Sequence, residues 1–417
     1  MMSRLIQTLA ILLALLATPG LANPAIADPA PQSPLILISI DGFRADYLDR
    51  AISPALSALA AGGVHATRMT PSFPSVTFPN HTTLVTGLVP DHHGIVNNAF
   101  IDPAMPGPFS MASKEERWWG ESTPIWITAE RAGLHTGVMF WPGVSVAHGG
   151  VRPGLFHDYD HAIAPDDRVD TVLGWFDLPA DQRPRLALVY FEQVDTAGHN
   201  FGPDSPQVDA AIRTIDTAVA RLIAGLKARS IHANVIVVAD HGMAAVGPDN
   251  LVLLDDVVDL TAAHVVFDGT VIGFDPAPTP AGKAARRALL TRAPHMHCWD
   301  KHAIPADLDY GTNPRVPAVV CQVQTGWLAM TRAEYARSQA RHPGLEKGAH
   351  GYDIHDPAMG ALFIANGPAF RRGLTLPPFP NVDVYPLMAT VLGITPHSGD
   401  GHLSDVAAAL DTTVHDR

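Results

Sequence analysis

Short apolar runs alternate with amphipathic stretches along most of this chain. Five of the runs predict buried strands, at residues 35–40, 135–140, 185–191, 234–239 and 360–365. Helical patterns lie between them, notably at residues 123–132 and 205–228, and the second begins with Ser205 as a suitable cap and Pro206 in the first turn. Strands that alternate with helices favour an α/β fold with a mostly parallel central sheet flanked by helices.

The pattern changes between residues 250 and 344. Strand-like pieces at residues 261–267, 270–274 and 315–324 surround one helical stretch at residues 281–292, among many prolines. We interpret residues 250–344 as a smaller α+β cap or insertion. The catalytic α/β core would then comprise residues 28–249 and 345–417. The alternative is that the main domain continues through this region with long loops.

Residues 1–27 have the pattern of an export signal. Arg4 precedes a stretch at residues 5–17 that is apolar except for Gln7 and Thr8. Ala25-Ile26-Ala27 offers a cleavage site, and residues 20–22 are a second candidate. The apolar stretch is short compared with the ~20 residues of a membrane span, so we expect a cleaved signal rather than an anchor. The protein is therefore predicted to be periplasmic or secreted, with no membrane span after signal removal.

Export changes the interpretation of the two cysteines, Cys298 and Cys321. In an oxidising compartment such a pair more often forms a disulfide than a metal site. We therefore expect a disulfide within the insertion. The alternative is two unrelated buried thiols.

Composition narrows the class of protein. The 417 residues are 47% hydrophobic and 17% charged, which allows a sizeable core and excludes a disordered or fibrous chain. A net charge of −13 disfavours a protein that coats nucleic acid. The chain has 21 histidines and two cysteines, which indicates metal sites built from imidazole and carboxylate rather than thiolate.

Three of the apolar runs are followed directly by segments that contain aspartate or histidine residues. Asp41 follows the run at 35–40, Asp240 and His241 follow the run at 234–239, and the segment with Asp195 and His199 follows the run at 185–191. Active sites of open α/β sheets lie beyond the carboxyl ends of the strands, so these side chains are expected to converge. With His350, from a glycine-rich segment, they offer three carboxylates and three imidazoles, which suit zinc. Taken singly, each residue has a common alternative role in a turn, a helix cap or a hydrogen bond.

The segment from residue 70 to residue 98 contains a candidate nucleophile. Thr77 precedes Phe78 and Pro79, and Pro79 suits the first turn of a helix that runs to about residue 86. A hydroxyl at a helix N-terminus lies where phosphate is favoured, and a divalent cation would ionise it near neutral pH. The alternative is that Thr77 only caps the helix.

Five segments occur together in this order: ISIDGFRADYL, TFPNHTTLVTGLVPDHHGIVNN, VDTAGHNFGP, VVADHGM and HGYD. This combination resembles the nucleotide pyrophosphatase/phosphodiesterase family, the type I phosphodiesterases of the alkaline phosphatase superfamily. The resemblance covers residues 35–368. It implies an alkaline-phosphatase-like core and a nucleotide or nucleotide-derivative substrate.

The resemblance also implies two Zn²⁺ per chain. The residues that match the ligands of the first zinc are Asp41, Thr77, Asp240 and His241. Those that match the ligands of the second zinc are Asp195, His199 and His350. Asn98 matches the residue that donates to a phosphoryl oxygen, with adjacent Asn97 as the alternative match. The residues that resemble the lining of the nucleobase slot are Phe78, Tyr159 and Tyr190.

The implied reaction is nucleophilic substitution at phosphorus. Thr77 would attack as an alkoxide and form a covalent intermediate, whose hydrolysis releases a nucleoside 5′-monophosphate. Alkaline phosphatases typically use serine, with an arginine on the phosphate, whereas this chain offers Thr77 and Asn98. Phe78 beside the nucleophile favours a bulky ester group. We therefore expect a phosphodiesterase or pyrophosphatase rather than a phosphomonoesterase.

Two alternatives stay open. One is a phosphodiesterase for lysophospholipid or glycerophosphocholine headgroups, because some relatives in the family hydrolyse such substrates. The other is a non-catalytic periplasmic protein that binds zinc and nucleotide. The sequence does not predict the base preference or the oligomeric state. The remaining histidines, including His81 and His93, are expected to have structural roles.

Overall fold

An eight-stranded sheet forms the core of the computed structural model, which describes residues 33–341 and 343–411. The strands run in the order β19 (Leu374–Leu376), β2 (Val64–Ala66), β18 (Phe363–Asn366), β9 (Asn234–Val238), β1 (Leu35–Ile40), β8 (Leu186–Phe191), β6 (Thr136–Met139) and β7 (Leu155–His157). All neighbours pair in parallel except β18, which is antiparallel to both β9 and β2. The predicted α/β fold with a mostly parallel sheet is therefore confirmed.

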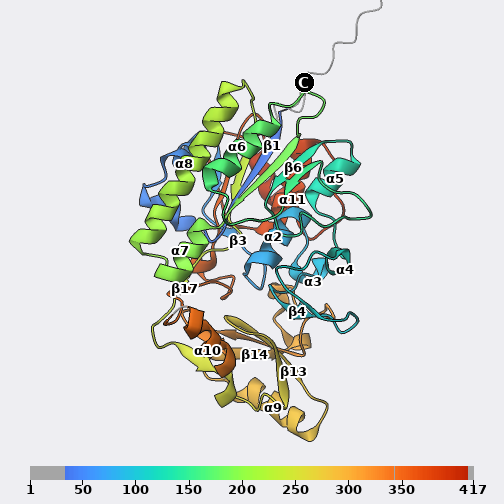
Figure 1. Cartoon of the computed structure of the whole chain (residues 1–417), viewed down its shortest axis with the longest axis vertical. Coiled ribbons are helices and arrows are strands. Elements are labelled where there is room, and N and C mark those ends of the chain that lie inside the picture. Colours follow the sequence, from blue (N-terminus) through green and yellow to red (C-terminus); the bar gives the residue numbers. More distant parts are fainter. Residues whose placement is uncertain (1–32, 342, 412–417) are drawn as a thin grey trace, which may run out of the picture. The chain divides into compact units, whose positions relative to one another are not determined.

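Helices cover the sheet, and the strands are buried because of them. One layer contains α8 (Pro206–Ala228), α6 (Pro165–Trp175) and α1 (Pro54–Gly62), and another contains α2 (Thr77–Thr86), α5 (Ile125–Arg131) and α11 (Val384–Leu392) (Figure 1). All residues of β1 and β9 are buried, as expected for parallel strands covered on two faces. Ser205 caps α8 as predicted, because its side chain accepts a hydrogen bond from the Val208 amide.

The strand order explains why distant segments meet. β1 lies between β8 and β9 and is parallel to both, so the carboxyl ends of all three strands lie at the same edge. β18 runs the other way, and its first residue, Phe363, pairs with Val238 near the end of β9. The chain that leads into β18 therefore arrives at this edge as well, and it carries His350. The short apolar run that forms β18 does not indicate whether this strand is parallel or antiparallel to its neighbours.

A second, smaller sheet is antiparallel. Its strands run in the order β12 (Ala263–Phe267), β13 (Val271–Pro276), β15 (Val319–Val323) and β14 (Met296–Asp300), and α9 (Pro280–Arg292) packs on it (Figure 1). Strand β14 was not expected from the sequence, because MHCWD has no clear apolar alternation. The expected disulfide joins Cys298 of β14 to Cys321 of β15.

The domain boundaries at residues 249/250 and 344/345 stay a prediction, because the described chain from Ser33 onward forms one compact unit. The export signal predicted at residues 1–27 lies outside the described residues. Within the part of the chain that is described, no helix combines the length and apolarity needed to cross a membrane.

Two buried charged side chains join the segment after β14 to the main core. The carboxylate of Asp91 accepts hydrogen bonds from the backbone amides of Gly311, Thr312 and Asn313. These bonds satisfy a carboxylate that is 5% exposed. They fix residues 311–313 against the chain that leads to Asn98.

Arg315 makes the second connection. Its side chain is 2% exposed and forms an ion pair with Asp102 at 2.8 Å. The guanidinium also donates to the carbonyl oxygens of Gly94 and Trp118. Arg315 therefore holds together three parts of the chain that are far apart in sequence.

Replacing Arg315 with methionine should destabilise the protein strongly. The Arg315→Met variant would leave the Asp102 carboxylate buried without its partner, which costs about 3–5 kcal/mol in comparable cases. Denaturant titration measures the free energy of unfolding. Arg337→Met is the control, because Arg337 pairs with Glu334 on the surface of α10 (Arg332–Arg341) and exposed pairs contribute little. Equal losses for the two variants would contradict this role of Arg315.

Candidate active site

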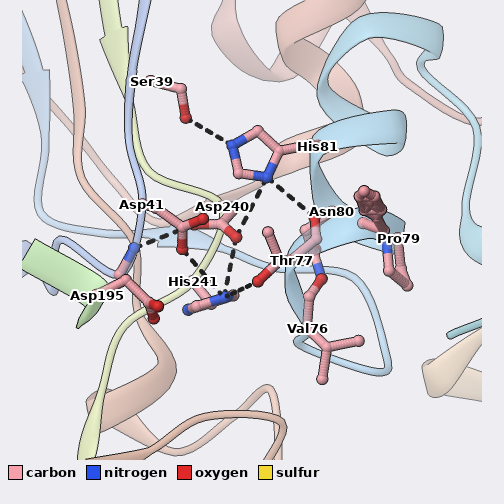
Figure 2. A network of polar contacts seen from close by, with 12 residues as sticks. Ser39, Asp41, Val76, Thr77, Pro79, Asn80, His81, Asp195, Asp240 and His241 are labelled. Atoms are coloured by element: carbon pink, nitrogen blue, oxygen red, sulfur yellow. Dashed lines mark hydrogen bonds and ion pairs between the residues drawn. The ribbon is translucent and has the colours of Figure 1, made fainter. Parts of the chain in front are cut away.

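Four polar side chains meet where β1 and β9 end (Figure 2). His241 Nε2 lies 2.9 Å from Asp240 Oδ2, 3.6 Å from Asp41 Oδ1 and 3.4 Å from Thr77 Oγ1. Asp41 and Asp240 are fully or almost fully buried. The structure thus brings together the residues that the resemblance assigns to the first zinc.

A second group adjoins the first. Asp195 and His199 lie one turn apart on α7 (Gln193–Phe201), with 3.4 Å between Asp195 Oδ1 and His199 Nε2. His350 Nε2 lies 3.7 Å from the same carboxylate oxygen. The rings of His241 and His350 stack with centroids 3.5 Å apart. His241 therefore lies within reach of both groups, although the resemblance assigns it to one.

Gly42 allows this close approach. It follows Asp41 with a φ of +66°, in the left-handed region that favours glycine. A Cβ at this position would lie 3.0 Å from the Asp195 Cα atom. The turn after β1 therefore requires glycine both for its conformation and for the contact with α7.

The three histidines present the same ring nitrogen to the site. Each Nδ1 lies close to a backbone carbonyl oxygen, at 3.0 Å from Gly242 for His241, 3.1 Å from Ser75 for His350 and 3.0 Å from Gly348 for His199. Because a carbonyl oxygen only accepts, each Nδ1 carries a proton. In its neutral form each ring then has a free electron pair at Nε2, as metal ligation requires.

Without a cation, the closely spaced carboxylates of the site disfavour one another's negative charge. Burial raises the pKa of Asp41 well above its usual range, and Asp240 and Asp195 raise it further. Burial also raises the pKa of Asp195. Oδ1 of Asp41 and Oδ1 of Asp195 are buried and accept no hydrogen bond from the described residues. These oxygens and the three imidazoles fit a divalent cation such as zinc.

Two overlapping sets of ligand atoms are close enough to hold an ion. Within each set the atoms lie within 4.8 Å of one another, and the sets are Asp41, Asp240, His241 and Asp195, His241, His350. His199 lies beside the second set through its contact with Asp195. Asp195 and Glu346 raise the pKa of His199 to about 9 although burial opposes this. Metal binding at His199 therefore competes with protonation.

Thr77 occupies the first turn of α2 but does not cap it. Val76 is the N-cap residue, and no side chain caps this helix. The Thr77 hydroxyl instead lies beside His241, at the mouth of both ligand groups. The expectation that Thr77 starts a helix ending at residue 86 is confirmed.

Asn98 lies beside the start of the same helix. Its Oδ1 accepts a hydrogen bond from the Phe78 amide at 2.8 Å, so its Nδ2 remains as the donor. Asn97 accepts from the Asn98 amide instead. Asn98, and not Asn97, lines the pocket at the site.

A pocket of about 440 Å³ opens onto these residues. The residues singled out from the sequence that line it are Asp41, Thr77, Phe78, Asn98, Tyr159, Tyr190, Asp195, His199 and His350. The hydroxyl of Tyr190 donates to Asp41 Oδ2 at 2.7 Å. Burial raises the pKa of Tyr190 well above its usual range, so this hydroxyl keeps its proton. Tyr159 is 53% exposed and leaves much of its ring accessible.

Acidic and imidazole side chains around a threonine, at one edge of a mostly parallel sheet, are the features that the resemblance predicts for a hydrolase of the alkaline phosphatase superfamily. The chain belongs to the type I phosphodiesterase/nucleotide pyrophosphatase family, whose model matches residues 35–353. It is 38% identical to an uncharacterized pyrophosphatase/phosphodiesterase of Schizosaccharomyces pombe, over 89% of this chain and 79% of that protein. It is 33% identical to human ectonucleotide pyrophosphatase/phosphodiesterase family member 7, over 97% of this chain and 89% of that protein.

Solved structures agree with this assignment. Human ectonucleotide pyrophosphatase/phosphodiesterase 5 superposes with a TM-score of 0.85 at 32% identity, covering 91% of this chain and 100% of that one. An inactive variant of the murine protein, in complex with AMP, matches equally well. Some relatives are longer than this chain. The match to bovine ectonucleotide pyrophosphatase/phosphodiesterase family member 3, at 35% identity, covers 43% of that protein.

Replacing Asp41 with asparagine should affect the metal-free and metal-loaded proteins differently. A carboxylate whose pKa is raised by folding destabilises the protein increasingly as the pH rises above its unfolded-state pKa, and fully above its folded-state pKa. Asp41→Asn should therefore not lower the melting temperature of chelator-treated protein at high pH. Added zinc should stabilise the parent more than the variant.

Thermal unfolding with and without zinc measures both effects. Asp46→Asn is the control, because Asp46 is exposed and pairs with Arg44. A variant that is destabilised equally with and without metal would show that Asp41 has a purely structural role.

Proposed function

We propose that this chain is a two-zinc phosphodiesterase that hydrolyses nucleotide phosphodiester or pyrophosphate bonds and releases nucleoside 5′-monophosphates. The observation that carries the proposal is the position of the Thr77 hydroxyl, 3.4 Å from His241 Nε2 and in a pocket lined by Asn98 and aromatic rings. The AMP complex of the murine relative supports a nucleotide as substrate.

The donor set would divide between two ions. Asp41, Asp240, His241 and Thr77 would hold one, and Asp195, His199 and His350 the other. When bound, zinc supplies positive charge that lowers the pKa of a hydroxyl and stabilises negative charge on phosphoryl oxygens.

The chain itself supplies the nucleophile and the positioning groups. Thr77 Oγ1 forms a bond to phosphorus as the bond to the leaving oxygen breaks, which gives a covalent intermediate on the threonine. Water then cleaves the new bond and releases the monophosphate. Asn98 Nδ2 donates to a phosphoryl oxygen, and the start of α2 provides the positive end of a helix dipole.

Aromatic side chains favour a nucleobase at the far side of the phosphate. Phe78 follows the nucleophile directly, and Tyr159 and Tyr190 line the same pocket. Their flat apolar surfaces suit stacking with a base. The rings of Tyr159 and Tyr190 lie edge to face, with centroids 6.1 Å apart.

The pocket is less suited to a choline headgroup. A quaternary ammonium is recognised by aromatic faces and unpaired negative charge. The acidic side chains outside the proposed ligands already have partners, because Asp158 pairs with Lys114 at 2.9 Å and Glu192 with the buried Arg168 at 2.8 Å. We therefore favour nucleotides over glycerophosphocholine. Membership in a family of hydrolases argues against a non-catalytic binding protein.

We also propose that the protein acts in the periplasm or outside the cell. The disulfide between Cys298 and Cys321 supports this location, because such bonds persist in oxidising compartments. Mass spectrometry of the mature N-terminus would test the expected cleavage of residues 1–27.

Removing the Thr77 hydroxyl should abolish turnover. With zinc present, Thr77→Ala should lower kcat for the nitrophenyl ester of thymidine monophosphate by at least about 10³-fold, because loss of a nucleophile removes the covalent route. Thr77→Ser keeps a hydroxyl and should retain more activity. AMP should still bind to Thr77→Ala.

A second experiment compares kcat/KM for the two substrate classes. It lets the nitrophenyl ester of thymidine monophosphate compete with glycerophosphocholine at equal concentration. Full activity of Thr77→Ala, or a preference for glycerophosphocholine, would overturn the proposed function.

A further inference from the structure

A buried histidine lies directly behind the site without lining the pocket. His81 is one turn along α2 from Thr77 and is 0% exposed. The sequence offered no reason to separate it from the chain's other structural histidines. Its position excludes contact with a substrate but allows contact with the groups that hold one.

Both ring nitrogens of His81 have partners from other parts of the site (Figure 2). Nδ1 lies 2.9 Å from the carbonyl oxygen of Thr77 and 3.3 Å from Oδ2 of Asp240. Because the carbonyl only accepts, Nδ1 carries a proton, and this N–H group lies beside the Asp240 carboxylate. Nε2 lies 2.9 Å from the hydroxyl of Ser39, which comes from β1.

Aromatic packing holds the ring in this orientation. Trp141 and Tyr190 pack edge to face against His81, with centroids 5.1 and 5.2 Å away. Trp141 also donates from Nε1 to the His81 carbonyl oxygen. Tyr190 is the same residue that donates to Asp41. The imidazole therefore has no room to turn without disturbing the pocket wall.

We propose that His81 is a positioning residue that fixes the Asp240 carboxylate and the Thr77 backbone relative to each other. The inference rests on the proposed function, because Asp240 and Thr77 matter as a metal ligand and a nucleophile. The other oxygen of Asp240 accepts from the Gly42 amide at 3.2 Å, and Oδ2 lies between His81 and His241. Of these two imidazoles, His81 is the one that is not a proposed metal ligand, so it can fix the direction in which Oδ2 faces the proposed metal.

His93 provides a matched control. It is also 0% exposed, and it contacts α2 through the Thr83 hydroxyl and the Pro79 carbonyl oxygen. None of its hydrogen bonds reaches Thr77 or Asp240. Replacing His93 therefore disturbs the packing of α2 without removing a contact to a site residue.

The test compares His81→Ala, His81→Asn and His93→Gln in the full-length protein. Outer partners of metal ligands typically contribute about 10–100-fold to metal affinity or activity. His81→Ala should weaken zinc binding, measured by competition with a chelator, and lower kcat with saturating zinc, each by about 10–100-fold. KM for the nucleotide ester should not change. His81→Asn keeps an N–H donor and should recover part of both losses.

His93→Gln should lower the melting temperature at least as much as His81→Ala while keeping zinc affinity and kcat near those of the parent. The proposal is overturned if His81→Ala binds zinc like the parent, or if its losses only follow the melting temperature as in His93→Gln. If His81→Ala does not fold, Ser39→Ala takes its place and should shift zinc affinity in the same direction. Zinc competition needs no turnover, so failure of the proposed activity is distinguishable from failure of this inference.

Discussion

The structure depends on three carboxylates, two of them buried and one partly buried, held next to one another at one edge of a sheet. Asp41 and Asp240 are buried at the ends of β1 and β9, and Asp195 lies partly buried on α7, just after β8. Burial and the neighbouring carboxylates Asp240 and Asp195 raise the pKa of Asp41, because burial of negative charge is costly. The parallel pairing of β8, β1 and β9 places the three carboxylates at this edge, and the glycine after Asp41 brings α7 close. A divalent cation, which the donor atoms fit, would turn this mutual repulsion into ligation.

The other features of the site follow from that constraint. Three histidines direct Nε2 inwards because backbone carbonyls hold each Nδ1, and the antiparallel β18 returns the chain so that His350 reaches the same edge. A net charge of −13 is compatible with a polyanionic substrate, because bound metal would supply the positive charge locally. The aromatic pocket beside Thr77 then selects what the phosphate is attached to.

The sequence predicts those parts of the fold and the site that are specified by residues within one short segment. β1 and α2 have the expected bounds, because a run that is apolar except for Ser39 specifies the strand and a proline in the first turn specifies the helix. The direction of β18, the strand β14 and the contact of His81 with Asp240 are not specified in this way, because they depend on packing between distant segments. His81 and His93 look alike in the sequence, and only the distances in the folded chain separate them.

The most direct test of the account is X-ray diffraction from crystals of zinc-loaded protein with AMP, using anomalous scattering at the zinc edge. The account predicts two zinc peaks per chain. One should be bound by Asp41, Asp240, His241 and Thr77, and the other by Asp195, His199 and His350, with the AMP phosphate beside Asn98. A single ion, ions bound elsewhere, or AMP outside the pocket would contradict it.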